Sequence, residues 1–217
     1  MTAPFVHLRV HSEFSLVDGL VRLKPLIQAA VDQGLPALTL TDEANLFGLV
    51  KFYKGAQGAG LKPIIGSDLW LANPHDEGHP YRLTLLAMDE TGYRNLIELI
   101  SRGWLHGQRH GQALLDKAWV LEQSAGLIAL SGGREGEVGR HLLSDHYDEA
   151  RALLEAWNAA FPGRFYLELT RTGRPLEEEC VHLSVDLAVE TGTPVVATND
   201  VRFLTRDDFW AHETRVA

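Results

Sequence analysis

The 217-residue sequence has little cysteine, fewer basic than acidic side chains and no long apolar run, and each shortage excludes a class of protein. The single cysteine, Cys180, rules out an internal disulfide and fits a reducing compartment. The 20 Lys and Arg against 29 Asp and Glu give a formal net charge of −9, the wrong sign for neutralising nucleic-acid phosphates. No apolar run approaches the ~18 residues of a membrane span, and Met1 to His7 lack the features of a signal peptide. We therefore expect a cytoplasmic protein without membrane contact. If DNA is involved, we expect other parts of a longer chain to hold it.

The sequence does have the composition of a folded protein, with 45% apolar and 23% charged residues. At roughly 150 residues per domain, its length allows one large domain or two small ones. Short apolar runs alternate with segments of helical period, which predicts an α/β fold around a largely parallel sheet. The predicted strands lie near residues 5–10, 37–41, 63–71, 81–87, 126–130, 164–169 and 194–198. Seven strands with helices between them favour a β/α barrel.

Apolar residues at helical spacing predict the faces that the helices bury. The first such face ends at Gly34 and Pro36, as expected at the C-terminus of a helix. The predicted faces are Leu23, Leu26, Ile27, Ala30 and Val31; Leu46, Leu49, Val50 and Tyr53; Tyr93, Leu96, Ile97 and Ile100; Tyr147, Ala150, Leu153, Leu154 and Trp157; and Leu176, Cys180, Leu183 and Leu187. Residues 73–80 and 106–112 are expected to form long loops. A last helix, capped by Thr205, runs to Ala217 without a stop signal, which suggests a chain cut from a longer one.

Polar residues gather just past the predicted strand ends, where β/α barrels carry out their chemistry. In a barrel these side chains would converge on one mouth, and carboxylates that converge need a cation, either a metal ion or arginine. Alternatively, Asp42 and Asp200 only cap the helices that follow them. The positions are His7, Arg9 and His11; Asp42 and Glu43; Asp68; residues 131–133; Glu168; and Asn199 and Asp200.

Four other features have simpler structural interpretations. The glycine-rich turn at 131–136 could hold a phosphate on backbone N–H groups, but such a turn is more often only a turn. Cys180 lies on an apolar helix face and is expected in the core. The loop histidines, His75, His79, His106 and His110, are expected to be solvated. The tryptophans, Trp70, Trp104, Trp119, Trp157 and Trp210, are expected mostly in the core, although one of them could anchor a partner.

Several long motifs stand out in the sequence, namely FVHLRVHSEFSLVDG at 5–19, LTDEANLFGLVKFY at 40–53, KPIIGSD at 62–68, TGYRNL at 91–96 and ATNDVRF at 197–203. These motifs resemble the N-terminal PHP (polymerase and histidinol phosphatase) domain of bacterial replicative DNA polymerase III alpha subunits. The resemblance covers the whole chain and implies a single PHP domain over residues 1–217, folded as a distorted seven-stranded β/α barrel. It also implies that the parent chain is a DNA-directed DNA polymerase, a nucleotidyltransferase whose catalytic carboxylates lie beyond Ala217.

The resemblance also implies a metal site, from which this sequence departs. Active PHP barrels use histidine and carboxylate ligands to hold divalent metals such as zinc or manganese, and they hydrolyse phosphoesters. Here arginine or glycine replaces a ligand at Arg9, Arg82, Arg202 and Gly133, and Glu43 stands at a histidine position. The positions of the vestigial cleft are Arg9, His11, Asp18, Glu43, Asp68, Arg82, Gly133, Asp200 and Arg202. Because guanidinium keeps its proton and repels a cation, we expect no bound metal, no catalytic residue, and arginines paired with the remaining carboxylates.

Three functions remain open at this point. The first is a catalytically silent scaffold that supports the polymerase and docks its separate proofreading exonuclease subunit, as similar family members are thought to do. The second is a residual metal-dependent phosphoesterase or exonuclease, which would use His11, Asp18, Glu43, Asp68 and Asp200 with a single metal ion. The third is a phosphate or nucleotide sensor that uses the arginines of the same cleft.

Overall fold

The structure is a computed structural model that describes residues 5–16 and 18–216. Within these residues the strands are β1 (Ala37–Leu40), β2 (Lys62–Leu71), β3 (Tyr81–Ala87), β4 (Gln108–Arg109), β5 (Gln112–Leu115), β6 (Leu127–Leu130), β7 (Phe165–Thr170) and β8 (Val195–Thr198). The α-helices are α1 (Leu23–Asp32), α2 (Leu49–Gly58), α3 (Glu90–His106), α4 (Lys117–Glu122), α5 (Glu137–Leu143), α6 (Tyr147–Ala160), α7 (Glu177–Thr191) and α8 (Phe209–Val216), with 3₁₀ turns η1 (Gly133–Glu135) and η2 (Arg206–Asp208).

The chain divides into two compact units. The terminal unit comprises Met1–Ser67 and Asn199–Ala217, and the central unit comprises Asp68–Thr198. Backbone hydrogen bonds link the strands in the order β4-β5-β2-β3-β6-β7-β8, and β1 pairs with β2. The α/β class expected from the alternation of strands and helices is confirmed.

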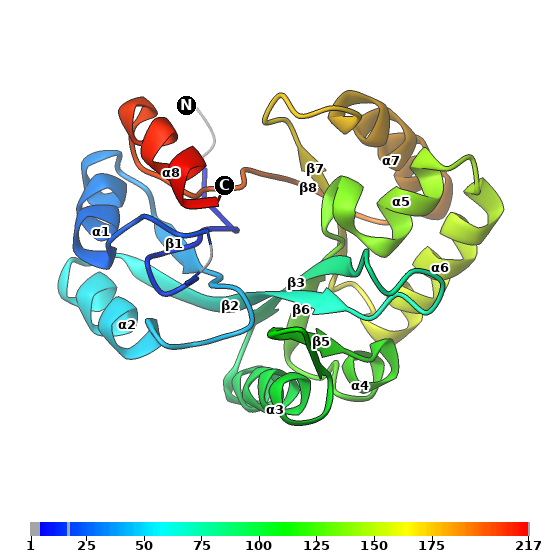
Figure 1. Ribbon diagram of the computed structural model, residues 1–217, viewed down its shortest axis with the longest axis horizontal. Helices are drawn as coiled ribbons and strands as arrows, with labels where there is room; N and C mark the ends of the chain where they lie inside the picture. The colour runs from blue at the N-terminus through cyan, green and yellow to red at the C-terminus, as the bar shows by residue number, and fades with distance from the viewer. Residues whose placement is uncertain (1–4, 17, 217) are drawn as a thin grey trace. The chain divides into compact units, whose positions relative to one another are not determined.

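In the terminal unit, β1 runs parallel to the first half of β2, with Ala37 opposite Lys62 and Leu40 opposite Ile65. Each of these strands follows a helix, so α1 and α2 run in the same direction, side by side next to β1 (Figure 1). Their inner faces meet in an apolar core that includes Leu26, Leu38, Phe52 and Leu61. Helix α8 also belongs to this unit, and the expected cap is confirmed because Thr205 and Asp208 form a capping box before it. The expected final residue of this helix, Ala217, lies outside the described residues.

In the central unit, β6, β7 and β8 are parallel, whereas β3 is antiparallel to β6. The expectation of a largely parallel sheet was wrong at β3. The loop between β2 and β3 contains no crossover helix, and a strand that follows its neighbour through a short loop reverses direction. Helix α7 packs on β7 and α3 packs on β3 and β5. Trp157 stacks on Phe165 with ring centroids 5.4 Å apart, which confirms this tryptophan as core.

One strand prediction and one loop prediction were wrong. Residues 5–9 form no strand, because this segment makes only scattered backbone hydrogen bonds and a single parallel bridge, from Val10 to Val201. Residues 106–112 were expected to be a loop but contain β4 and the start of β5. The two strands pair antiparallel around His110 and Gly111, both with positive φ, which suits a tight hairpin turn. The other predicted strands and the loop at 73–80 are confirmed.

Several predicted core residues are on the surface instead. Val31 and Ile97 are both 39% exposed, at the edges of their apolar faces, and Val50 and Tyr53 are exposed because α2 buries Phe52 and Ala56 instead. Leu176 is exposed because it precedes α7 in a left-handed conformation rather than lying on the face of the helix. Trp104 and Trp210 are 43% and 75% exposed.

Cys180 is buried, as predicted, and its burial raises the pKa of the thiol. The four loop histidines are exposed, also as predicted. None of the helices described is both long enough and apolar enough to span a membrane.

Glu177, the first residue of α7, holds the loop that precedes this helix. Its carboxylate accepts hydrogen bonds from the backbone N–H groups of Thr172, Gly173 and Arg174 at 2.6, 2.9 and 3.1 Å, and from the Thr172 hydroxyl at 2.6 Å. Burial alone would raise the pKa of Glu177, but the hydrogen bonds to the ionised form outweigh it and lower the pKa below its ordinary value. The ionised carboxylate therefore stabilises the folded chain.

Replacing Glu177 by glutamine is expected to lower the free energy of unfolding at neutral pH by roughly 1.5–3 kcal/mol, because a charged acceptor of several N–H groups is lost. A carboxyl group whose pKa is lower in the folded state stabilises the fold above its unfolded-state pKa, and this contribution disappears as the pH falls through the folded-state pKa. Urea unfolding of the wild type and E177Q should therefore differ at neutral pH and converge below the usual glutamate pKa of ~4.3. Glu178→Gln, a change to an exposed neighbour, is the control. An equal loss at all pH values would show that the charge is not what holds the loop.

Candidate functional site: two arginine–carboxylate clusters

The structure gathers most of the predicted site residues into two clusters, one in each unit. The terminal cluster consists of Arg9, His11, Asp18, Asp200 and Arg202. A parallel backbone bridge joins Val10 to Val201. In an extended chain, the residues on either side of a given position point to the same face. Arg9 and His11, which flank Val10, therefore meet Asp200 and Arg202, which flank Val201. Asp18 comes from the turn between this segment and α1.

Arg202 contacts three members of the terminal cluster. Its Nε donates to Oδ1 of Asp200 at 2.8 Å, and its Nη1 contacts Oδ2 of Asp18. The same Nη1 lies 2.8 Å from Nδ1 of His11. The side chains of Arg202 and Asp200 are only 7% and 4% exposed. Arg9 adds a second guanidinium, with Nη2 at 3.5 Å from Oδ1 of Asp200. Two arginines therefore neutralise two carboxylates in a buried setting.

Burial, together with the neighbouring Arg9, lowers the pKa of Arg202 to about 9. This pKa is still well above neutral, so the Arg202 guanidinium is charged at physiological pH. The ring nitrogen Nδ1 of His11 also lies 2.9 Å from the Ser15 hydroxyl and 3.0 Å from Oδ1 of Asp18. Because this nitrogen carries either a lone pair or a proton, it can accept from Arg202 or donate to Asp18, but not both at once.

Asp42 does not cap a helix. It is 1% exposed and accepts hydrogen bonds from the Ser12 backbone N–H at 2.6 Å and from the Ser12 hydroxyl at 2.9 Å, whereas Gly48 occupies the N-cap of α2. Asp200 does not cap a helix either, because Thr205 is the N-cap of η2, the next helical turn along the chain. The capping interpretation was therefore wrong for both residues. Glu43 is half-buried, and its backbone N–H donates to the Ser15 hydroxyl at 3.0 Å.

The central cluster consists of Asp68 and Trp70 from β2, Arg82 and Thr84 from β3, and Glu135 from η1. Arg82 Nη1 donates to Oδ2 of Asp68 at 2.9 Å, and its Nε lies 3.0 Å from Oε2 of Glu135. The Thr84 hydroxyl donates to the other oxygen of Asp68. The guanidinium also lies 4.2 Å from the ring centroid of Trp70, a cation–π arrangement. Arg82 is therefore fixed by two carboxylates and an aromatic face, and its side chain is 7% exposed.

The glycine-rich turn binds a carboxylate of the chain itself. The backbone N–H of Gly132 donates to Oε2 of Glu168 at 3.1 Å, and the Thr198 hydroxyl donates to Oε1 at 2.5 Å. The Ser131 hydroxyl accepts from the backbone N–H of Glu168 at 2.9 Å. Gly133 opens η1 and has no side chain to offer a ligand. The Gly132 N–H group is therefore already used by an anion of the chain itself, which favours the interpretation of residues 131–136 as a structural turn.

The expected pairing of arginines with carboxylates is confirmed for Arg9, Arg82 and Arg202. The contributors that the sequence did not reveal include Ser12, Ser15, Trp70, Thr84, Glu135 and Thr198. Trp70 could have been found from the two-residue spacing that puts it on the same strand face as Asp68. Glu135 lies within the glycine-rich turn, and its acidic side chain could have indicated an ion pair with an arginine. The roles of the serines depend on chain turns that no sequence pattern revealed.

A family model described as "PHP domain" matches residues 7–172, and the chain belongs to this family. It is 56% identical over 216 residues to the DNA polymerase III subunit alpha of Pseudomonas aeruginosa, and 48% identical over 213 residues to that of Escherichia coli K12. The matches cover 100% and 98% of this chain, and the chain spans 18% of the length of these relatives.

Solved structures support the fold. A protein named as an amidohydrolase from Chromobacterium violaceum matches with a TM-score of 0.59 at 15% identity, over 97% of this chain and 96% of the other. A protein named as a metal-dependent phosphoesterase from Bifidobacterium adolescentis matches with a TM-score of 0.58 at 13% identity, over 99% and 97%. At these identities the likeness establishes the fold alone.

Proposed function

We propose that this chain is a catalytically silent PHP domain that acts as a scaffold in a cytoplasmic DNA polymerase III alpha subunit. In this proposal, nucleotidyl transfer belongs to other parts of the polymerase, which also hold the DNA. The observation that carries the proposal is the pairing of Arg202 with Asp18 and Asp200. In an active PHP site these carboxylates would be metal ligands, whereas in this chain they face the fixed positive charge of a guanidinium group.

The donor set does not fit a divalent metal centre. A metal ion needs free lone pairs from histidine or carboxylate, and arginine offers none. In the terminal cluster, Asp18 and Asp200 are engaged by guanidinium groups, and Asp68 is engaged by Arg82 and Thr84 in the central cluster. Each arginine would also repel an incoming cation. These residues therefore do not support a metal-dependent step.

We expect no stoichiometric metal on the purified protein after incubation with zinc or manganese and dialysis, because the guanidinium groups stand where the ligands would be. Elemental analysis measures this directly. The combined variant R9H/R82H/R202H is the matched comparison, and only such a variant is expected to begin to retain metal. A tightly held ion on the wild type that is lost in His11→Ala would favour the alternative, a residual metal-dependent phosphoesterase.

The scaffold role also predicts a partner. If the domain cuts no phosphoester, proofreading must come from another protein, and we propose that the separate exonuclease subunit docks here. The net charge of −9 disfavours direct DNA binding and suits a partner segment with basic and apolar side chains.

Calorimetric titration of the full-length polymerase subunit should therefore give saturable binding of the exonuclease subunit. The isolated domain should show no measurable affinity for single-stranded or duplex DNA at physiological salt. Tight DNA binding by the domain together with no exonuclease binding by the full-length subunit would overturn the scaffold proposal.

A further inference from the structure

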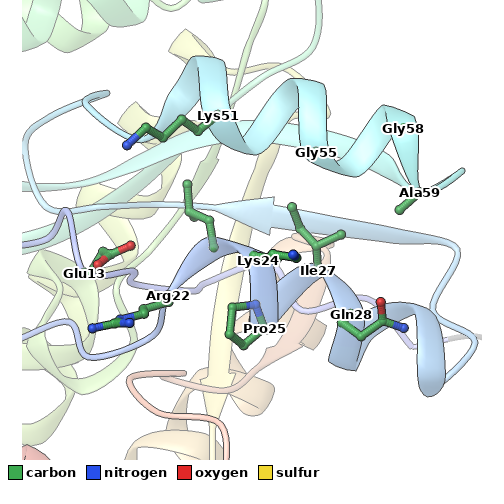
Figure 2. A pocket seen from close by; sticks show the side chains of 11 residues that line it. Glu13, Arg22, Lys24, Pro25, Ile27, Gln28, Lys51, Gly55, Gly58 and Ala59 are labelled. Carbon is green, nitrogen blue, oxygen red and sulfur yellow. The ribbon is translucent and has the colours of Figure 1, made fainter.

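A groove of about 780 Å³ lies between α1 and α2 in the terminal unit (Figure 2). None of its lining residues belongs to either arginine–carboxylate cluster. The two helices come close together at Gly55, where an added Cβ would lie 2.7 Å from Cδ1 of Ile27. Further along α2, a Cβ at Gly58 would have no neighbour within 4 Å. The absence of a side chain at Gly58 therefore leaves one end of the groove open.

The floor and the rim of the groove differ in chemistry. Leu23 and Ile27 are buried in its floor, whereas Arg22, Lys24 and Lys51 are exposed at its rim. Glu13 is the one acidic residue among the described residues that line it. The groove thus carries a local excess of positive charge on a chain whose net charge is −9.

Two of the three basic side chains lie at one end of the groove. Figure 2 shows Arg22 and Lys51, together with Glu13, toward the end where both helices begin, and Gln28, Gly58 and Ala59 toward the other end. Neither helix has an acidic residue in its first turn or a side-chain hydrogen bond at its N-cap. Since a helix N-terminus carries a partial positive charge, the two helix starts add to the charge of the side chains.

We propose that this groove is the docking site for a segment of a partner protein that carries acidic side chains next to an apolar one. The acidic side chains lie at the end marked by Arg22 and Lys51, and the apolar side chain lies over Gly58. The charged rim would bind carboxylates through charge-assisted hydrogen bonds, and the apolar floor would bury the neighbouring side chain. A small inorganic anion would leave that floor uncovered. This site goes beyond the proposed function, in which the charge of the whole domain favours a basic exonuclease segment.

The test uses the full-length protein and a short fluorescein-labelled peptide in which glutamates are followed by leucine, and binding is measured by fluorescence anisotropy. We expect saturable binding, and affinity at least about tenfold weaker when lysine replaces glutamate or serine replaces leucine. Gly58→Trp, which fills the open end, should weaken binding by a similar factor. Gly78→Trp adds the same bulk at an exposed glycine of the central unit and should leave binding unchanged.

A charge-reversal pair tests the rim. Lys24→Glu with Lys51→Glu places an acid in the first turn of each helix, which favours the helices themselves, so lost binding would not come from unfolding. Lys54→Glu, on α2 but outside the lining, is the control. The proposal is overturned if the peptide does not bind, or if all variants bind it equally. It is also overturned if an oligonucleotide binds with the same affinity as the peptide, because the groove would then be a nucleic-acid site. Loss of self-association of the chain in Gly58→Trp would overturn it too, because the groove would then bind a second copy of the chain.

Discussion

Replacing Arg202 by alanine is expected to lower the free energy of unfolding by about 3–5 kcal/mol, because the buried Asp200 and the partly buried Asp18 lose their main counter-charge. Asp200 is 4% exposed, so water cannot easily take the place of the guanidinium. For a chain of this size such a loss corresponds to a fall in melting temperature on the order of 10 °C. Urea and thermal unfolding of the wild type and R202A measure it.

Arg94→Ala is the matched control for this prediction. Arg94 also forms an ion pair, with Glu90 at 2.5 Å, but the two side chains are 75% and 76% exposed. An exposed pair of this kind contributes at most about 1 kcal/mol. If R202A destabilised the chain no more than R94A, the guanidinium would not hold the terminal cluster together, and the idea that arginine replaces the metals structurally would be wrong. Asp18→Asn combined with R202A should recover part of the loss, since it removes one of the stranded charges.

The fold could be predicted where the sequence pattern and the packing agree. The runs at 37–41 and 81–87 are dense in apolar residues and form strands whose residues are almost all buried. The segment at 5–10 has a similar composition, but only Val10 forms a bridge. The apolar periodicity of the sequence predicted helix α2, but it did not predict which face of this helix is buried. The close approach of Gly55 to Ile27 turns Phe52 inward and leaves Val50 exposed, and a single helix's sequence does not contain that constraint.

The candidate site was predictable where flanking residues share a strand face. Arg202 and Asp200 lie two residues apart, and family resemblance pointed to both. Partners that come from distant segments were harder to foresee. Ser12 donates to Asp42 and Glu135 pairs with Arg82 only because the chain folds back on itself. Such hydrogen bonds depend on tertiary placement, and no local pattern encodes them.

Gly132 is expected to tolerate alanine poorly, for two reasons that add. Its φ of +79° is a left-handed conformation that costs a residue with a Cβ about 1–2 kcal/mol. An added Cβ would also lie 2.3 Å from the backbone oxygen of Arg82, so the turn would have to move away from β3. That movement would break the buried hydrogen bond from the Gly132 N–H to Glu168, a loss of about 1–3 kcal/mol.

Together these effects predict that Gly132→Ala lowers the free energy of unfolding by about 3–5 kcal/mol, measured by urea unfolding. Gly163→Ala separates the two causes. Gly163 has a similar φ of +67°, but an added Cβ there would have no neighbour within 4 Å, so only the conformational cost of about 1–2 kcal/mol applies. Equal losses in the two variants would mean that the close approach of Gly132 to Arg82 contributes nothing. A loss several times larger for Gly132→Ala would show that glycine is needed here because it lets the turn reach Glu168, which ties the glycine-rich turn to β7 in the central unit.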